Sequence, residues 1–219
     1  MKPKSKAAFL VLSILFLCIL GLLLFGRTFP SLGIKFKTNT ITTNSLKIDR
    51  NIFYRQTLNN CGPYSVMAVI NILKQETVDP EILAQEMKWR IYKNLTFPLG
   101  IGDLLEEYNV ETKEYVLWNY KEDEKISWLK NIIDEGKPII LLIEINHIKH
   151  YFTVLGYDEK GFMIYDSLQN KRIDNQRMTI IDKEDYVGNR YYNSEYLIRL
   201  WNDGGFKIFF QNWALVCNI

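Results

Sequence analysis

Hydrophobic positions divide the chain into three kinds of segment. Residues 7–26 are apolar without a single charged side chain. Between residues 61 and 135, apolar side chains recur every three or four positions, the spacing of amphipathic helices. From residue 138 onward they form short runs bounded by Pro, Gly or Asn, which is typical of strands. This order predicts an α+β fold, with helices first and mostly antiparallel strands after them.

Four helices are predicted in the first half of the body. The clearest runs from Cys61 to Lys74, with Asn60 as its cap and Pro63 in the first turn, where a missing N–H costs little. The other three are expected at 79–90, 103–108 and 122–135.

The second half is predicted to form a sheet. Residues 139–145 fit a central buried strand, and residues 150–157 and 162–166 fit a hairpin around the turn 158–161. We expect two final strands at 195–201 and 206–219, joined by a hairpin turn of Asn, Asp and two Gly.

The N-terminal apolar run predicts a membrane anchor. Its length corresponds to roughly 30 Å of helix, the thickness of a bilayer core. Lysines at positions 2, 4 and 6 precede it, and bulky residues stand where a signal peptidase needs small ones. We therefore favour an uncleaved single-pass anchor in the cell membrane over a cleaved signal.

The positive-inside rule then sets the expected orientation. Residues 1–6 form a cytoplasmic tail, 7–26 the transmembrane anchor, and 27–47 a linker rich in Thr, Asn and Ser. The body, 48–219, lies outside the cytoplasm.

Charge and composition exclude several functions. The net charge is +2, from 27 basic and 25 acidic residues. Four of the basic residues precede position 28, so the body has 27 − 4 = 23 basic against 25 acidic residues, a net of −2. Such a body is a poor binder of nucleic acid. With two histidines and three cysteines, we expect no metal and no cofactor.

Cys61 is the candidate nucleophile. A thiolate is stabilised at the start of a helix by unpaired N–H groups and the helix dipole. Gly62 leaves space for a substrate, and Gln56 can donate to an oxyanion together with the Cys61 N–H. The alternative is structural: Cys61 and Cys217 form a disulfide, or both are buried thiols.

His150, at the start of a strand, is the candidate base, and Asp166 is the candidate partner that orients it. In a flat hairpin with an odd loop, Asp166 faces Val154, about 13 Å along the strand from His150. A bulge, strong coiling or different pairing must close that gap. His147 is expected to be a surface residue.

These residues carry a family resemblance. The stretch QTLNNCGPYSVMAV (56–69), HYFTVLGYD (150–158) and the strand ending at Asp166 resemble papain-like cysteine peptidases, most closely the bacteriocin-processing, double-glycine leader peptidase branch. The resemblance covers roughly residues 50–175. It implies a papain-like fold with Cys61 as nucleophile, His150 as general base, Asp166 as orienting acid and Gln56 as oxyanion donor. The chain departs from the family pattern at Ser167, where Pro is usual.

The function implied is a cysteine peptidase that acts on peptides or proteins outside the cytoplasm through an acyl-enzyme. Two alternatives stay open: a thiol-dependent amidase or acyl- or peptidyltransferase, and a non-catalytic module that binds peptides. Specificity for a double-glycine leader is not implied, because the chain lacks the transporter domains that accompany it. Cys217 and the aromatic residues between 186 and 213 are expected to pack the core.

Overall fold

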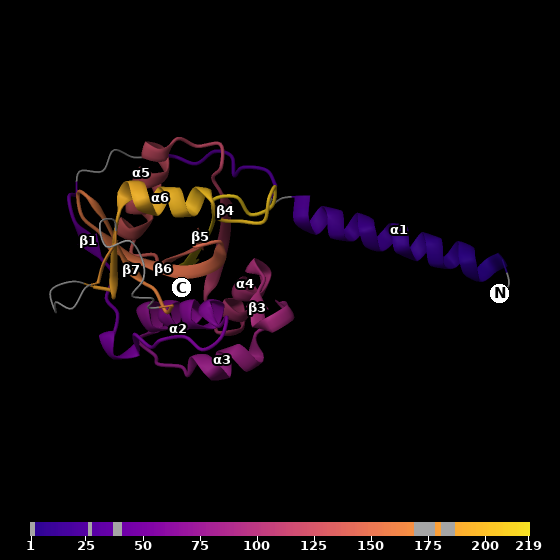
Figure 1. The fold of residues 1–219 in the computed structure, drawn as a ribbon, viewed down its shortest axis with the longest axis horizontal. Coiled ribbons are helices and arrows are strands. Elements are labelled where there is room, and N and C mark those ends of the chain that lie inside the picture. The colour runs from indigo at the N-terminus through magenta and orange to yellow at the C-terminus, as the bar shows by residue number, and fades with distance from the viewer. Residues whose placement is uncertain (1–2, 26–27, 37–40, 169–177, 181–186) are drawn as a thin grey trace.

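The computed structural model describes residues 3–25, 28–36, 41–168, 178–180 and 187–219. In these ranges one antiparallel sheet has helices on both faces (Figure 1). The strand order is β4-β10-β5-β6-β7-β9-β8, and β1 pairs with β6. The strands are β1 (Asn44–Ser45), β4 (Glu111–Val116), β5 (Ile139–Ile145), β6 (Ile148–Tyr157), β7 (Gly161–Tyr165), β8 (Met178–Ile180), β9 (Arg190–Asn193) and β10 (Trp213–Asn218).

Two helical layers cover the sheet. One contains α2 (Cys61–Lys74), α3 (Pro80–Glu86) and α4 (Pro98–Glu107), and the other contains α5 (Glu122–Asp134) and α6 (Ser194–Asn202) (Figure 1). The short hairpin of β2 (Arg90–Ile91) and β3 (Leu95–Thr96) lies beside the first layer.

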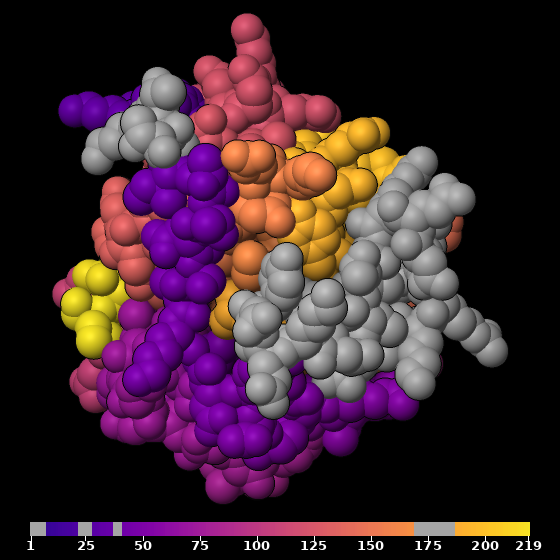
Figure 2. All heavy atoms as spheres, turned by 90° about the vertical axis from the view of Figure 1, so that its left-hand side faces the viewer, coloured from indigo at the N-terminus to yellow at the C-terminus, as the bar shows by residue number. Residues whose placement is uncertain are grey.

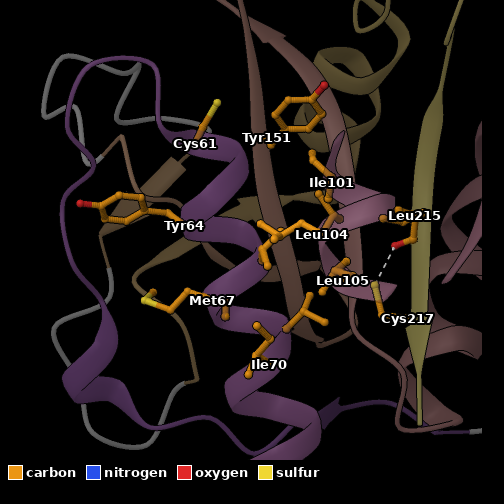
Figure 3. Close-up of a cluster of buried hydrophobic side chains, with 14 of the residues drawn as sticks. Cys61, Tyr64, Met67, Ile70, Ile101, Leu104, Leu105, Tyr151, Leu215 and Cys217 are labelled. Carbon is orange, nitrogen blue, oxygen red and sulfur yellow. Dashed lines mark hydrogen bonds between the residues drawn. The ribbon is translucent and has the colours of Figure 1, made fainter. Parts of the chain in front are cut away.

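Each face of the sheet has its own apolar core. Met67 and Ile70 of α2 and Leu104 of α4 are buried against the first face (Figure 3). Leu129 of α5 and Trp201 of α6 are buried against the second. The active-site candidates lie where the first layer meets the sheet.

The N-terminal part of the body is attached to the sheet. β1 pairs with the end of β6, and Figure 2 shows residues 41–60, in purple, running over the surface from the orange strands to the helical layer. Earlier in the chain, Ser31 donates its backbone N–H to Val116 O at 2.8 Å and accepts from Val116 N through Oγ at 3.0 Å. The predicted linker therefore contains segments that are bonded to the body.

The helix α1 (Pro3–Phe25) extends away from the body (Figure 1). Within the described part of the chain, no helix has the combination of length and apolar character needed to cross a bilayer.

Much of the predicted secondary structure is confirmed. The bounds of α2 agree with the prediction, and α5, β5 and the β6–β7 hairpin lie where they were expected. The second helix is shorter than predicted, since α3 ends at Glu86. The strands β4 and β9 were not predicted.

The prediction of a strand at 195–201 is wrong, because these residues belong to α6. Asn193 accepts a hydrogen bond from the backbone N–H of Tyr196 and so caps a helix whose apolar side chains share one buried face. Asn202 is the last residue of α6, so residues 203–205 follow a helix and join no hairpin, and the last strand is confined to β10.

Candidate active site

Cys61 is the first residue of α2, and its side chain is almost buried. The predicted cap is wrong in detail: Asn60 occupies the cap position, but its side chain makes no capping hydrogen bond. Its amide instead donates to Thr57 Oγ1 at 2.6 Å and to Glu81 Oε2 at 3.2 Å. The N–H groups of the first turn therefore lack a side-chain acceptor from the cap residue and can face an anion.

Glu81 of α3 fixes the segment that leads into Cys61. Its Oε1 accepts from Thr57 Oγ1 and from the Tyr64 hydroxyl, both at 2.9 Å. Burial, and then the Glu81 carboxylate, raise the pKa of Tyr64 to about 12, so this phenol stays a donor. Sequence reasoning missed Glu81, because nothing local marks a glutamate that bonds to a segment twenty residues earlier.

Gly62 lies against Thr96 of β3. A Cβ atom on it would lie 2.9 Å from Thr96 Oγ1 and 3.0 Å from Thr96 Cβ. The missing side chain therefore allows β3 to pack against the start of α2, and the role of Gly62 in leaving space for a substrate stays a prediction.

The predicted alternative of a disulfide is wrong. Cys61 and Cys217 are both free thiols, and they lie apart in the apolar core (Figure 3). Cys217 is fully buried in β10, as expected of a core residue, and burial raises the pKa of its thiol. Tyr192, Trp201 and Trp213 are also buried, which confirms the core placement of the late aromatic residues.

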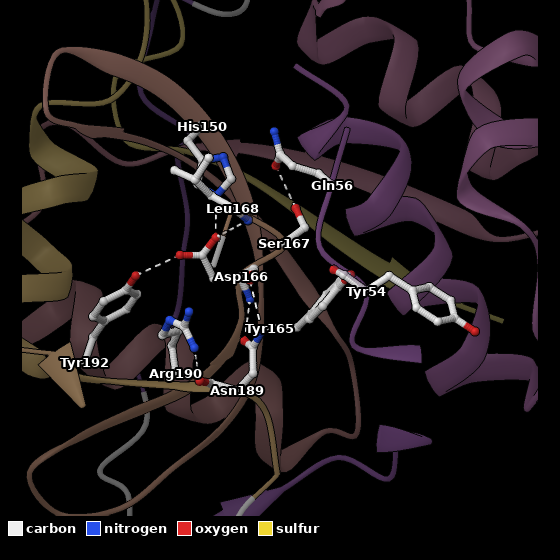
Figure 4. A network of polar contacts seen from close by, with 10 residues as sticks. All are labelled: Tyr54, Gln56, His150, Tyr165, Asp166, Ser167, Leu168, Asn189, Arg190 and Tyr192. Carbon is white, nitrogen blue, oxygen red and sulfur yellow. Dashed lines mark hydrogen bonds and ion pairs between the residues drawn. The ribbon is translucent and has the colours of Figure 1, made fainter. Parts of the chain in front are cut away.

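His150 of β6 connects Cys61 to Asp166. Its Nε2 lies 2.8 Å from Asp166 Oδ1 (Figure 4), and Cys61 is near enough to the ring to raise the pKa of His150. Burial lowers the pKa of His150, but the Asp166 carboxylate and then Cys61 outweigh it and raise that pKa to about 10. Since Nε2 is occupied by Asp166, Nδ1 is the nitrogen left to face the sulfur.

A bulge in β6 brings Asp166 to His150. Tyr157 pairs with Phe162, so the turn between them has an even number of residues. By itself such a turn would put the Asp166 side chain on the face of the sheet opposite to His150. The register then shifts by one residue between Val154 and Gly156, which restores the face. The loop with an odd number of residues that was considered from the sequence is therefore wrong. The bulge is what brings the Asp166 side chain to His150.

The carboxylate of Asp166 is held from β9 and from the residues around it (Figure 4). Tyr192 donates its hydroxyl to Oδ2 at 3.0 Å, and Leu168 donates its N–H to Oδ1 at 2.9 Å. Asn189 binds both the N–H and the C=O of Asp166. Burial opposes ionisation, but His150, the Leu168 N–H and Arg190 lower the pKa of Asp166. Sequence reasoning missed Arg190 and Tyr192 because it missed β9.

Gln56 lies beside this network. Its backbone N–H donates to Ser167 O at 2.9 Å, and its side-chain Oε1 accepts from Ser167 Oγ at 2.8 Å (Figure 4). Gln56 is thus bonded to Ser167, the residue after Asp166, and Asp166 is bonded to His150. His147 has a fully solvent-exposed side chain, as predicted. The described residues contain no group of three His, Cys, Asp or Glu side chains suited to a metal.

The chain is similar to known peptidases in sequence profile and in fold. The profile of the Peptidase_C39 like family matches residues 47–197. A protein described as a C39-like peptidase from Bacillus anthracis is 14% identical, and the match covers 80% of this chain and 98% of that one at a TM-score of 0.52. A double glycine motif protease from an AMS/PCAT transporter, solved with a leader peptide, is 15% identical, with 82% and 96% covered and a TM-score of 0.51. No curated protein matches the chain.

The two solved structures share the papain-like arrangement of helices packed on an antiparallel sheet, and the profile match spans most of the body. The chain belongs to the C39-like peptidase family, and it is a cysteine-type peptidase of that family.

Proposed function

We propose that the protein cleaves peptide bonds through a thioester on Cys61, with His150 as general acid and base, Asp166 as its orienting carboxylate and Gln56 as oxyanion donor. The observation that carries the proposal is the buried chain of contacts from Cys61 through His150 to Asp166. A nucleophile, a base and a group that fixes the base are in contact, as covalent catalysis requires.

The reaction follows from these positions. The Cys61 thiolate attacks the carbonyl carbon, and the electron pair of the C=O bond moves to oxygen. That oxyanion receives hydrogen bonds from the Cys61 N–H and the Gln56 amide. As the C–N bond breaks, His150 passes its proton to the leaving amine, and a thioester remains. Water then gives a proton to His150, attacks the thioester and releases the acid and the thiolate.

The electrostatics of His150 suit both steps. In the free enzyme its raised pKa, caused by Asp166 and Cys61, keeps the imidazolium protonated and ready to act as an acid. Once Cys61 is a thioester, its negative charge is gone, and the contribution of Cys61 to that pKa is lost. His150 has by then given its proton to the leaving amine. With the thiolate gone its pKa is lower, so the ring stays neutral until it accepts the proton of the attacking water.

The proposed substrate is a peptide or protein. The similar structure solved with a leader peptide supports a peptide, but its double-glycine specificity is not carried over to this chain. These observations support cleavage of a peptide bond and do not extend to the sequence around it.

The test is cleavage of a peptide library by the full chain and by Cys61→Ala, with products identified by mass spectrometry. Cys217→Ala is the matched control, because it removes a free thiol away from His150. We expect cleavage by the wild type and the control and none by Cys61→Ala. Equal cleavage by all three would end the proposal, and products joined to added amines would favour a transferase.

We also propose that residues 7–26 anchor the chain in the cell membrane, with residues 1–6 in the cytoplasm and the peptidase domain outside it. The support is the uncharged run itself and the lysines that precede it. Along α1 the described large apolar side chains, such as Phe9 and Phe16, are exposed. A lipid environment would remove them from water.

A further inference from the structure

Ser167 makes a contact that the family pattern does not provide. Pro is usual after the aspartate, and a proline has no hydroxyl. Ser167 is buried, and its Oγ lies 2.8 Å from Gln56 Oε1. The backbone bond from Gln56 N–H to Ser167 O, at 2.9 Å, needs only a carbonyl and would survive any residue at this position. The side-chain bond is therefore the contribution of Ser167 alone.

This contact sets the direction of the Gln56 amide. A glutamine amide has an acceptor end and a donor end, and an oxyanion requires the donor end. Because the Ser167 hydroxyl donates to Oε1, the NH₂ group is directed away from Ser167 (Figure 4). In the described part of the chain, this NH₂ group has no protein acceptor that would compete with a substrate oxygen. Without the hydroxyl, the amide could rotate and present its oxygen.

We propose that Ser167 is a positioning residue that orients Gln56 as an oxyanion donor. The inference rests on the proposed function and extends it, since Asp166 and Ser167 are consecutive residues. One turn after β7 then holds both the base, through Asp166, and the oxyanion donor, through Ser167.

The test is a double-mutant cycle on the full chain with a cleaved peptide. We expect Ser167→Ala to lower kcat about tenfold, a part of the roughly 100- to 1,000-fold cost of removing an oxyanion donor, with KM within about twofold. Ser167→Thr, which keeps the hydroxyl, should restore most of kcat. In a Gln56→Ala background, Ser167→Ala should change kcat by less than about twofold, because its target is gone.

A second measurement separates this role from a structural one. Ser167→Ala should leave the rate of Cys61 alkylation by iodoacetamide unchanged, since Ser167 contacts neither Cys61 nor His150 in the hydrogen bonds described. An equal loss of kcat in both backgrounds, or a slower alkylation, would overturn the inference. If instead Cys61→Ala cleaves as well as wild type, the proposed function itself fails, whatever Ser167 does.

Discussion

His150 Nε2 lies 2.8 Å from Asp166 Oδ1, although the two residues come from different strands and both are buried. A buried carboxylate and imidazole are stable together only as a hydrogen-bonded pair, since either charge alone in the core is costly. The pair therefore links the stability of the fold to pH.

We predict a loss of stability on the alkaline side. The pKa of His150 is raised by Asp166 and Cys61 from 6.5 to about 10 in the folded protein. The stabilisation that His150 gives to the folded state is complete below its pKa in the unfolded chain, and it is lost as the pH rises toward its pKa in the folded protein. The free energy of unfolding should therefore fall between pH 6.5 and about 10, with a slope of at most about 1.4 kcal/mol per pH unit. Urea unfolding followed by tryptophan fluorescence measures it.

On the acid side, the free energy of unfolding should fall as the pH falls. The pKa of Asp166 is lowered by His150, so its contribution is present above the unfolded value of 3.8 and disappears as the pH falls through the folded value. The control for the alkaline prediction is His150→Gln. In this variant the free energy of unfolding should change less between pH 6.5 and about 10. An unchanged slope in that variant would show that another group titrates.

Tyr192→Phe tests the support of Asp166 from β9. The variant removes the hydroxyl that donates to Oδ2 at 3.0 Å and leaves a buried carboxylate oxygen without that donor. Hydrogen bonds to charged groups contribute about 1.5–3 kcal/mol, so we expect a loss of stability in that range. We also expect kcat/KM to fall about tenfold, which corresponds to about 1.4 kcal/mol, as His150 is held less well.

Tyr191→Phe is the matched control for that variant. Tyr191 precedes Tyr192 on the same strand and donates its hydroxyl to Asp158 Oδ1 at 2.6 Å, in the turn between β6 and β7. Its loss should cost stability without lowering kcat/KM. Equal kinetic losses in both variants would indicate that β9 matters only for folding.

Sequence reasoning located α2 and Cys61 because their determinants are local: an Asn-Asn turn, Pro63 in the first turn and helical spacing after it. It named His150 and Asp166 but could not pair them. Their register depends on a bulge at Leu155, and no residue there specifies an extra position. Gly156 is only a weak sign of the bulge, because the absence of its side chain is already explained by the close approach of β1.

Other features arise only from tertiary structure. The segment 195–201 is short and apolar, so its composition suits a strand as well as a helix, and packing against β5 and β7 decides for α6. Glu81 and Tyr192 are polar groups whose partners lie 17 to 26 positions away. Such contacts are fixed by the fold and have no spacing that a sequence could show.

The proposed anchor predicts a membrane-bound protein. The full chain should stay with the membrane fraction after alkaline carbonate extraction, and the double variant Leu15→Lys with Ile19→Lys should be released. Each charge near the centre of a span costs about 2.5–3.5 kcal/mol on insertion scales. Leu32→Lys, at an exposed site after α1, is the control and should stay bound.

Orientation is a separate measurement on the same cells. Protease added outside intact cells should degrade the body if it lies outside the cytoplasm. Protection of the body until the cells are lysed would reverse the proposed orientation, and release of the unmodified chain by carbonate would remove the anchor.

Gly62→Ala decides between two roles for the residue after the nucleophile. In a helix, Ala is favoured over Gly by about 1 kcal/mol, but the new Cβ would lie 2.9 Å from Thr96 Oγ1. Overpacking a buried contact costs about 1–3 kcal/mol, so we expect a net loss of stability and, because the start of α2 moves, a lower kcat. Thermal unfolding and steady-state kinetics measure the two effects.

Gly102→Ala in α4 is the control, since the nearest atom to its Cβ is Thr112 Oγ1 at 3.7 Å. It should be neutral or stabilising. Thr96→Ala should partly restore the stability of Gly62→Ala, because it removes the closest atom of the clash. If Gly62→Ala is as stable as Gly102→Ala but has a raised KM, then the absent side chain serves the substrate, and the packing role assigned to it is wrong.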